Sequence, residues 1–352
     1  MPTLRALSLI LLAPLAAGCP GPAAVIGDPD TSSVSCDRIH GATGIVMLSD
    51  EGNDWHHPDV APSDTLSTTT VAGPMADGTW LAVENGRVYA STNGGCDWDT
   101  TGGSIPNTGD WQFVVSGAYA YAFDRAGSAT ANSQDGLSWA SGDSSEPFLG
   151  VPAADAAIAG RLRGVQARGV VTSEDFGTTW TPSGAPPPAP PNGAAMYPGD
   201  LETAVISHSG GVAITRNGGS TWEEIGAELI EDGFVPQAIA FATTDPNTIW
   251  TAGAEGEFVM IYRTVDGGTS WNDVATSKSL DLEADAGLWP VPGKPNELLS
   301  AWASSEDNYG MNIYHIIAGD QIHTSYSGAY FHVNDIAVTE DGSWLIATDG
   351  IP

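Results

Sequence analysis

Carboxylate, amide and hydroxyl side chains recur along this chain in one short phrase, Ser/Thr-x-Asp-x-Gly-x-Ser/Thr-Trp. The phrase is complete at Ser173–Trp180 and Thr264–Trp271, and Asn replaces Asp at Ser91–Trp98 and Thr215–Trp222. Oxygen-bearing side chains at alternate positions before a glycine resemble the spacing of Ca²⁺-binding loops. Each copy supplies at most one or two carboxylates, whereas Ca²⁺ takes about six to eight oxygen ligands. The sequence therefore predicts no metal site at these phrases.

The phrase is better interpreted as a turn that its own side chains stabilise. Side chains such as those of Ser173 and Asp175 bond nearby backbone groups, and Gly177 adopts a conformation that other residues resist. Trp180 is expected to bury its ring between sheets. The residues that we assign to this structural role are Asp50, Gly52, Trp55, Asn93, Gly95, Trp98, Gly136, Trp139, Ser173, Asp175, Gly177, Trp180, Thr215, Asn217, Gly219, Trp222, Thr264, Asp266, Gly268 and Trp271.

Arginine side chains concentrate in one segment, Gly160–Gly169, which contains Arg161, Arg163 and Arg168 although the whole chain has only 11 basic residues. We expect this segment to be a hairpin, and the proline-rich loop Thr181–Gly193 follows it. Because function usually lies on loops of a rigid scaffold, the three arginines are the candidate binding residues. The alternative is a set of surface loops without a ligand.

Histidines offer a second candidate site. His315 and His323 would face each other across a hairpin if Ala318–Asp320 form its loop, which predicts either a metal or pH-sensitive pair or a hydrogen-bonded surface pair. His56 and His57 are adjacent, so on a strand they would point to opposite faces and could not share an ion. No Ser-His-Asp order, phosphate-binding glycine loop or nucleophilic Cys stands out, and we expect no cofactor.

The spacing of the phrases indicates the elements that carry them. Copies end at Trp55, Trp98, Trp139, Trp180, Trp222 and Trp271 and, in a worn form, at Phe331, mostly about forty residues apart. Two short apolar strands precede most copies, as in Trp80–Ser91, and a further strand precedes each pair, as in Trp111–Ser116. Four strands in about forty residues are typical of a β-propeller blade.

The two ends of the chain together make up one of these blades, the one that carries the copy ending at Trp55. Asn334–Pro352 supplies a first and a second strand, and Gly44–Trp55 supplies a third strand and a phrase. Pairing of these segments would close the ring and remove its exposed sheet edges. The sequence thus predicts an all-β, seven-bladed propeller of four-stranded antiparallel blades, in which the N- and C-terminal strands share one blade.

The first residues resemble a bacterial lipoprotein signal. Arg5 precedes the apolar run Ala6–Ala17, which is shorter than the about 20 residues that a membrane span needs. The run leads to LAAGC, and the resemblance implies cleavage before Cys19 and acylation of that residue, although Ala16 stands where such signals more often have Leu. Ordinary signal-peptidase cleavage nearby is the alternative. We expect a bacterial envelope protein on the outer membrane or cell surface, with the acyl anchor as its contact with the bilayer.

These expectations divide the chain into a signal peptide (1–18), a flexible tether (19–37) and the propeller (38–352). Once Cys19 is acylated, Cys36 and Cys96 are the two remaining thiols, and an exported protein is expected to pair them in a disulfide. The net charge of −32 repels nucleic acid. We therefore expect a monomer without a nucleic-acid partner.

The repeated phrase resembles the Asp-box, or bacterial neuraminidase repeat, over essentially the whole mature chain. That family includes sialidases, xyloglucanases, sortilin-type receptors and photosystem II assembly factors. Sialidases of this family carry Arg-Ile-Pro, whereas here Arg38 and Ile39 are followed by His40, and three arginines in one hairpin cannot converge from separate blades. The assembly factors are similar in size and imply a non-catalytic docking role, although they carry a basic patch that this acidic chain lacks.

The expected function is therefore docking of an unknown protein or glycan partner on the face opposite the phrases. The alternative is a glycoside hydrolase on the same scaffold, which would need two carboxylates about 5 Å or about 6.5–9.5 Å apart. The 43 acidic residues leave that alternative open.

Overall fold

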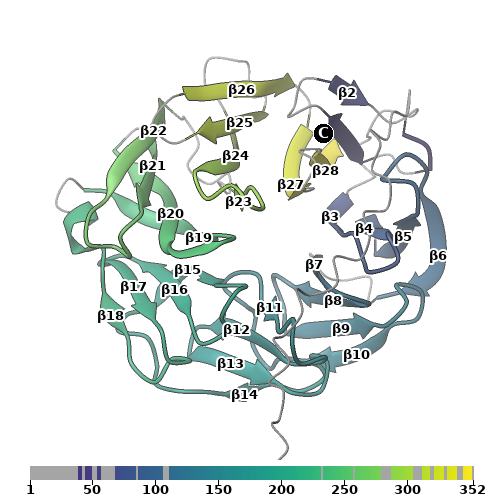
Figure 1. Ribbon diagram of the computed structural model, residues 1–352, viewed down its shortest axis with the longest axis horizontal. Helices are drawn as coiled ribbons and strands as arrows, with labels where there is room; N and C mark the ends of the chain where they lie inside the picture. Colours follow the sequence, from purple (N-terminus) through teal and green to yellow (C-terminus); the bar gives the residue numbers. More distant parts are fainter. Residues whose placement is uncertain are drawn as a thin grey trace, which may run out of the picture. The chain divides into compact units, whose positions relative to one another are not determined.

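The computed structural model describes residues 39–41, 44–49, 54–56, 68–84, 86–105, 111–230, 233–256, 258–278, 287–303, 311–317, 321–328, 331–338 and 344–350. Their strands belong to one compact unit, Ser33–Pro352. They form seven four-stranded antiparallel sheets (Figure 1). The predicted all-β propeller with four-stranded antiparallel blades is confirmed. No helix within these residues is long and apolar enough to cross a membrane.

Six of the sheets are built from consecutive strands. The first two sheets contain β3 (Thr68–Ala72), β4 (Trp80–Glu84), β5 (Arg87–Ser91) and β6 (Asp99–Ser104), and β7 (Trp111–Ser116), β8 (Tyr119–Asp124), β9 (Ala129–Ser133) and β10 (Ala140–Asp143). The next two contain β11 (Ala153–Ala154), β12 (Leu162–Gln166), β13 (Gly169–Ser173) and β14 (Thr181–Pro182), and β15 (Pro191–Met196), β16 (Ala204–His208), β17 (Gly211–Thr215) and β18 (Glu223–Glu224). The last two contain β19 (Val235–Ala242), β20 (Asp245–Glu255), β21 (Phe258–Thr264) and β22 (Asn272–Lys278), and β23 (Gly287–Pro290), β24 (Glu297–Ala303), β25 (Met311–Ile317) and β26 (Gln321–Gly328). A 3₁₀ turn, η2 (Ala227–Ile230), links β18 to β19.

The remaining sheet joins the two ends of the chain. It consists of β27 (Phe331–Val338), β28 (Trp344–Gly350), β1 (Ile45–Ser49) and β2 (Asp54–His56). β1 pairs with β28 along its length, and Thr348 donates its N–H to the Gly44 carbonyl at 2.7 Å. The ends of the sequence thus form one four-stranded sheet, as their strand pattern predicted.

Burial explains why the second and third strands are the most apolar. Every residue of β16 and β17 is buried, because these strands are covered on both faces by the neighbouring sheets. Such continuous runs, AVISH and GVAIT, are typical of strands inside a sandwich of sheets. The outer strands β14 and β18 contain only two residues each, and all four are exposed.

The first strands of the sheets face one another around the centre of the ring (Figure 1). Contacts lead from β27 to β3, from β3 to β7 and from β7 to β11. In the sheet of β11 it is β12 that contacts β15, and contacts then lead through β19 and β23 back to β27. Hydrogen bonds join several of these neighbours. Ala194 donates its N–H to the Leu149 carbonyl at 3.1 Å, and Asn192 Nδ2 donates to the Pro236 carbonyl at 2.9 Å. The first strands therefore form the wall of a central channel.

The phrase at Ser173–Trp180 has the predicted turn structure. Ser173 Oγ accepts the Gly177 N–H at 2.9 Å, and Asp175 accepts the Thr179 N–H and hydroxyl at 2.9 and 2.7 Å. The Trp180 indole donates to the Gly177 carbonyl at 3.0 Å. Gly177 has φ +77°, a conformation that favours glycine. These internal bonds use the polar groups that a cation would need, and no cluster of three potential metal ligands occurs among the described residues.

Other copies keep part of this bonding, although the Trp222 and Trp271 indoles donate to the Ala185 and Ile225 carbonyls outside their phrases. Asn93 and Asn217 accept the N–H four residues later at 3.0 and 2.9 Å, so the amide oxygen replaces the carboxylate. Asp50 and Gly52 lie outside the described residues.

The worn seventh copy, Thr324–Phe331, does not form the turn expected of a phrase. Its first five residues belong to the fourth strand β26, and Phe331 begins the first strand of the next sheet, β27. No phrase separates β25 from β26, so this blade is defined by its four strands.

The tryptophans of the phrases pack between sheets, but most are only half-buried. Trp98 is 3% exposed, whereas Trp180 is intermediate. The Trp180 ring lies edge-on to Phe123 of the preceding sheet and to Phe148, with centroids 6.0 and 4.8 Å apart. Trp139 stacks on Phe113 at 5.1 Å. The rings therefore join neighbouring sheets from the rim, which corrects the expectation of full burial.

The carboxylates of the phrases should make the stability of the fold decrease at acid pH. Hydrogen bonds from the Ser270 hydroxyl and N–H, and from the Thr264 hydroxyl, lower the pKa of Asp266 from 3.8 to about 2. Because the folded pKa is depressed, the stabilisation is complete above the unfolded value and is lost as pH falls through about 2. The melting temperature of the wild type should therefore fall more steeply below about pH 4 than that of Asp266→Asn. Parallel profiles, with Asp273→Asn as the control, would contradict this.

Candidate functional site

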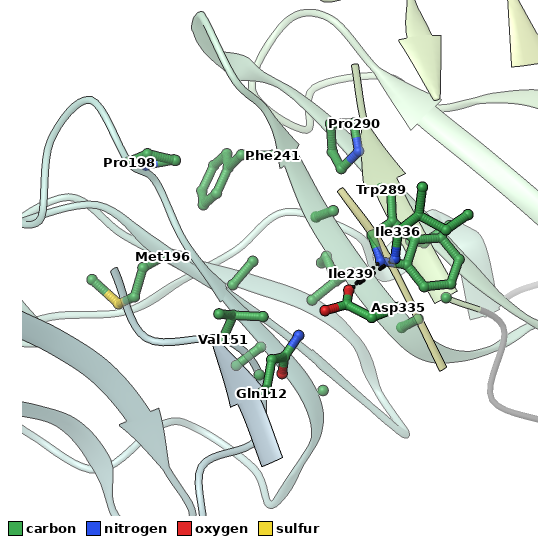
Figure 2. A pocket seen from close by; sticks show the side chains of 18 of the residues that line it. Gln112, Val151, Met196, Pro198, Ile239, Phe241, Trp289, Pro290, Asp335 and Ile336 are labelled. Atoms are coloured by element: carbon green, nitrogen blue, oxygen red, sulfur yellow. Dashed lines mark hydrogen bonds between the residues drawn. The ribbon is translucent and has the colours of Figure 1, made fainter. Parts of the chain in front are cut away.

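The central channel encloses a cavity of about 1120 Å³. Its wall comes from β3, β7, β15, β19, β23 and β27 and from the segment that precedes β11. Figure 2 shows that Val151, Met196, Ile239, Phe241 and Trp289, contributed by the segment before β11 and by β15, β19 and β23, border the same space. Most of the lining side chains are aliphatic or aromatic, as is usual for binding cavities, while polar atoms form nearly half of the exposed lining surface.

Register identifies the end of the channel that lies opposite the phrases. Gln112 pairs with Phe123 beside the turn from β8 to β9, whereas the phrase of that sheet follows the other end of β9. Val235 pairs with Ala254 beside the turn from β20 to β21. Leu149, two residues before Val151, bonds Val165 close to the turn from β12 to β13.

We call this end of the channel the channel mouth. We define it by five residues that line the cavity and come from three first strands and the segment before β11: Gln112, Val151, Asn192, Val235 and Gln237. It combines two exposed valines with three carboxamide side chains. These five residues are uncharged, although Arg125 of the turn from β8 to β9 also lines the cavity and the chain as a whole carries a net charge of −32.

Asp335 is the one carboxylate among the described residues of the cavity wall, and four donors surround it. The Thr70 hydroxyl and the Val71 N–H donate to Oδ2 at 2.7 and 3.4 Å. The Trp289 indole and the Ile336 N–H donate to Oδ1 at 3.0 and 2.9 Å. The side chain, in a residue only 6% exposed, thus connects β23, β27 and β3. Its lone pairs are engaged within the fold, so it is a structural acceptor rather than a general base.

The acid–base requirement of a glycosidase is not met by these wall residues. Hydrolysis of a glycosidic bond uses two carboxylates, one as acid and one as base or nucleophile. Within the described part of the wall, Asp335 is the only acid and Arg125 the only cation, and Arg125 donates to the Asn334 carbonyl at 3.0 Å. The described wall thus supplies one of the two carboxylates that a glycosidase uses.

The structure separates the three arginines that the sequence grouped. Leu162 pairs with Ser173, so Arg161 and Arg163 lie at the phrase end of their sheet. Arg163 is 8% exposed, and its guanidinium contacts Glu202 of the next sheet at 2.8 Å. The ion pair joins a buried Arg163 to a Glu202 side chain that is 46% exposed, so the expected placement of Arg163 on the face opposite the phrases is wrong.

Arg161 and Arg168 lie at different ends of β12. Arg161 contacts Glu174 within the phrase at 3.3 Å and Asp155 at 3.6 Å. Arg168 lies in the turn on the side of the channel mouth and contacts Glu146 at 2.9 Å. A strand extends about 3.3 Å per residue, so neighbours in sequence are carried apart along it. The three side chains therefore do not form one surface, and a binding role for them stays a prediction.

The histidine hairpin has the predicted register. His315 in β25 pairs with His323 in β26. His315 Nε2 lies 2.9 Å from Glu297 Oε2, and its ring meets Trp344 edge-on with centroids 5.4 Å apart. His315 is therefore bonded to Glu297 of the neighbouring strand, and a joint role of the two histidines stays a prediction.

The predicted disulfide lies partly outside the described residues, because Cys36 belongs to the undescribed part of the chain. Cys96 is 6% exposed. His40 donates its N–H to the Cys96 carbonyl at 2.8 Å, so the segment that follows Cys36 lies beside the second phrase. This geometry agrees with the pairing, which stays a prediction. Cys19 also lies outside the described residues.

Sequence reasoning missed the channel wall. Gln112 and Gln237 lie near the starts of two first strands and Asp335 lies in the middle of a third, and no local motif marks them. Their location on the first strands of different repeats is the one signal that an alignment of the repeats would have offered.

No protein-family model and no curated protein matches this chain. Among solved structures it is similar to the GH74 enzyme of Niastella koreensis, with TM-score 0.54 and 19% identity over 74% of this chain and 40% of that one. It is also similar to YCF48 bound to a D1 peptide, with TM-score 0.55 and 14% identity over 89% and 99% of the two chains. The chain thus spans about 40% of the length of the GH74 enzyme. At these identities the likeness establishes the β-propeller fold and nothing finer.

Proposed function

We propose that this seven-bladed propeller is a non-catalytic binding module that docks a protein partner at the channel mouth, on the face opposite the phrases. The observation that carries the proposal is the continuity of apolar surface from that face into the channel. Val151 and Val235 are 38% and 42% exposed at the mouth, and Phe258, the first residue of β21 at the same end of the sheet as Val235, is 44% exposed. Large apolar side chains that stay exposed around a cavity are typical of interaction sites.

Two further observations support a protein partner. The described channel wall holds no pair of carboxylates for glycoside hydrolysis. The similar propeller YCF48 is described with a bound peptide, so a scaffold of this fold can hold a polypeptide. The GH74 enzyme is similar to the same degree and would support the alternative of a glycoside hydrolase, but the described wall supplies only one of the two carboxylates that this activity uses.

Export and anchoring belong to the same proposal. The signal-like segment before Cys19 supports a lipid-anchored protein of a bacterial envelope, on the outer membrane or cell surface, with the propeller held by residues 19–37. The strong negative charge would keep the domain away from anionic headgroups. Acylation of Cys19, seen by mass spectrometry, is the readout for the anchor.

Docking at the mouth predicts that a charge placed there abolishes partner capture. Val235→Lys adds an ammonium group to the apolar rim, and its desolvation should weaken binding by about 10-fold or more. Val265→Lys is the matched control, because Val265 is 50% exposed within a phrase on the other face. Partners captured by the detergent-solubilised full chain from envelope extracts should be lost with Val235→Lys and kept with Val265→Lys. The reverse pattern would contradict the proposed face.

A further inference from the structure

We propose that the channel binds an extended, uncharged and predominantly apolar segment of the partner polypeptide, inserted through the channel mouth. This inference rests on the proposed docking function and specifies the chemistry of the ligand. Four properties of the wall carry it: its apolar interior, its satisfied charges, the carboxamides at the mouth and its length.

The interior of the channel offers apolar contacts from several sheets. Val115, Ile239, Phe241 and Leu288 line the cavity on three different first strands. Removing apolar area from water contributes roughly 25 cal/mol per Å², so aliphatic side chains of a ligand gain free energy at this wall. A charged side chain would lose its hydration there without finding a partner.

The charged groups of the wall are engaged in holding the ring together. Asp335 accepts four hydrogen bonds from the protein, and Arg125 Nη2 donates to the Asn334 carbonyl. Recognition at this wall therefore depends on apolar contact and neutral hydrogen bonds. Binding should accordingly depend little on salt, in contrast to an association steered by the acidic surface.

The carboxamides at the mouth match the groups of a peptide backbone. Gln112, Asn192 and Gln237 belong to β7, β15 and β19. Asn192 uses its Nδ2 on the Pro236 carbonyl, which leaves its Oδ1 as an acceptor at the mouth. A carboxamide carries both a donor and an acceptor, as a peptide unit does. These side chains can therefore receive the N–H and C=O groups of an entering main chain.

Three aromatic residues line the described wall. Phe113 and Phe241 are 5% and 4% exposed, whereas Trp289 is half-buried and its indole N–H is held by Asp335. The described wall therefore offers a sugar at most one half-buried ring for stacking.

The length of the wall also favours a polymer. Lining residues run along β19 from Val235 to Phe241 and continue to Thr243. At about 3.3 Å per residue, an extended ligand segment of roughly six to eight residues matches that length. The cavity of about 1120 Å³ exceeds the about 300–1,000 Å³ that is usual for small-molecule sites.

Selection from random peptides tests this inference and does not require the identity of the partner. The full-length protein would be panned against a phage library of peptides of about twelve residues, which exceeds the span of the wall at about 3.3 Å per residue. Parallel panning would use Val115→Lys, which charges the channel interior, and the matched control Val265→Lys. Gln237→Leu alters an exposed position and removes one mouth carboxamide without touching the core.

The expected result is enrichment of peptides with uncharged apolar runs on the wild type and on Val265→Lys, and their loss on Val115→Lys. Synthetic copies should bind Gln237→Leu several-fold more weakly, since one hydrogen bond is worth about 0.5–1.5 kcal/mol. Their Kd should change less than about two-fold between about 0.05 and 0.5 M NaCl. Absence of enrichment, enrichment of charged peptides, or equal enrichment on Val115→Lys would overturn the inference.

The two proposals fail in different ways. If Val235→Lys loses the partner and Val115→Lys keeps it, the docking face stands and insertion into the channel is wrong. If Val235→Lys keeps the partner, the docking face itself is wrong.

Discussion

Replacing Asp335 by alanine is expected to lower the free energy of unfolding by about 3–5 kcal/mol. The side chain is 6% exposed and accepts hydrogen bonds from Thr70, Val71, Trp289 and Ile336. Alanine leaves these donors buried without an acceptor, and an unsatisfied buried group costs about 1–3 kcal/mol. Three neighbouring sheets would lose their common contact. Urea unfolding followed by tryptophan fluorescence measures the change.

The variant Asp335→Asn distinguishes the loss of hydrogen bonds from the loss of side-chain volume. The amide keeps one acceptor oxygen and the volume of the side chain, so its destabilisation should be less than half that of alanine. Asp273→Ala, at an exposed strand position, is the control and should fall within about 0.5 kcal/mol of the wild type. Equal stability of Asp335→Ala and the wild type would show that the carboxylate does not join the sheets.

Replacing Trp344 by alanine should destabilise the closure of the ring by about 3–5 kcal/mol. Trp344 is 2% exposed in β28, where its backbone pairs with Leu48 of β1. Its ring packs in a buried cluster that includes Leu299 and Ile313 of the preceding sheet. Truncation opens a cavity between the sheet formed by the chain ends and its neighbour, and the surroundings relax only partly.

Trp222→Ala is the matched control, because Trp222 is half-buried at the rim of another blade. It should cost clearly less than Trp344→Ala, while Trp344→Phe should restore part of the loss. Differential scanning calorimetry gives the three melting temperatures. A smaller loss for Trp344→Ala than for Trp222→Ala would contradict the closure that joins the chain ends.

Much of the fold was predictable because the phrase carries its own structural mechanism. Ser173, Asp175 and Gly177 form a turn through bonds within eight residues, so local sequence is sufficient to recognise it. Strand pattern likewise predicted that the two chain ends share a sheet. The copy that ends at Phe331 does not form this turn, because its degenerate sequence keeps few of the side chains that make these bonds.

The candidate site was not predictable because no local segment contains it. Gln112, Asn192 and Gln237 meet only because three first strands surround one axis. Grouping Arg161 with Arg163 and Arg168 assumed that nearness in sequence means a shared surface. Arg163 instead lies within an ion pair with Glu202, which only the packing of the next sheet reveals.

Hydrogen–deuterium exchange of the full chain, with and without a selected peptide, shows whether the ligand binds along the first strands or at the phrases. On peptide binding, exchange should slow in β7, β15 and β19 and stay unchanged in Ser173–Trp180 and Thr264–Trp271. Such a result would place the ligand at the channel mouth and leave the phrases as structural turns. Protection confined to the phrases, with no change along the first strands, would contradict it.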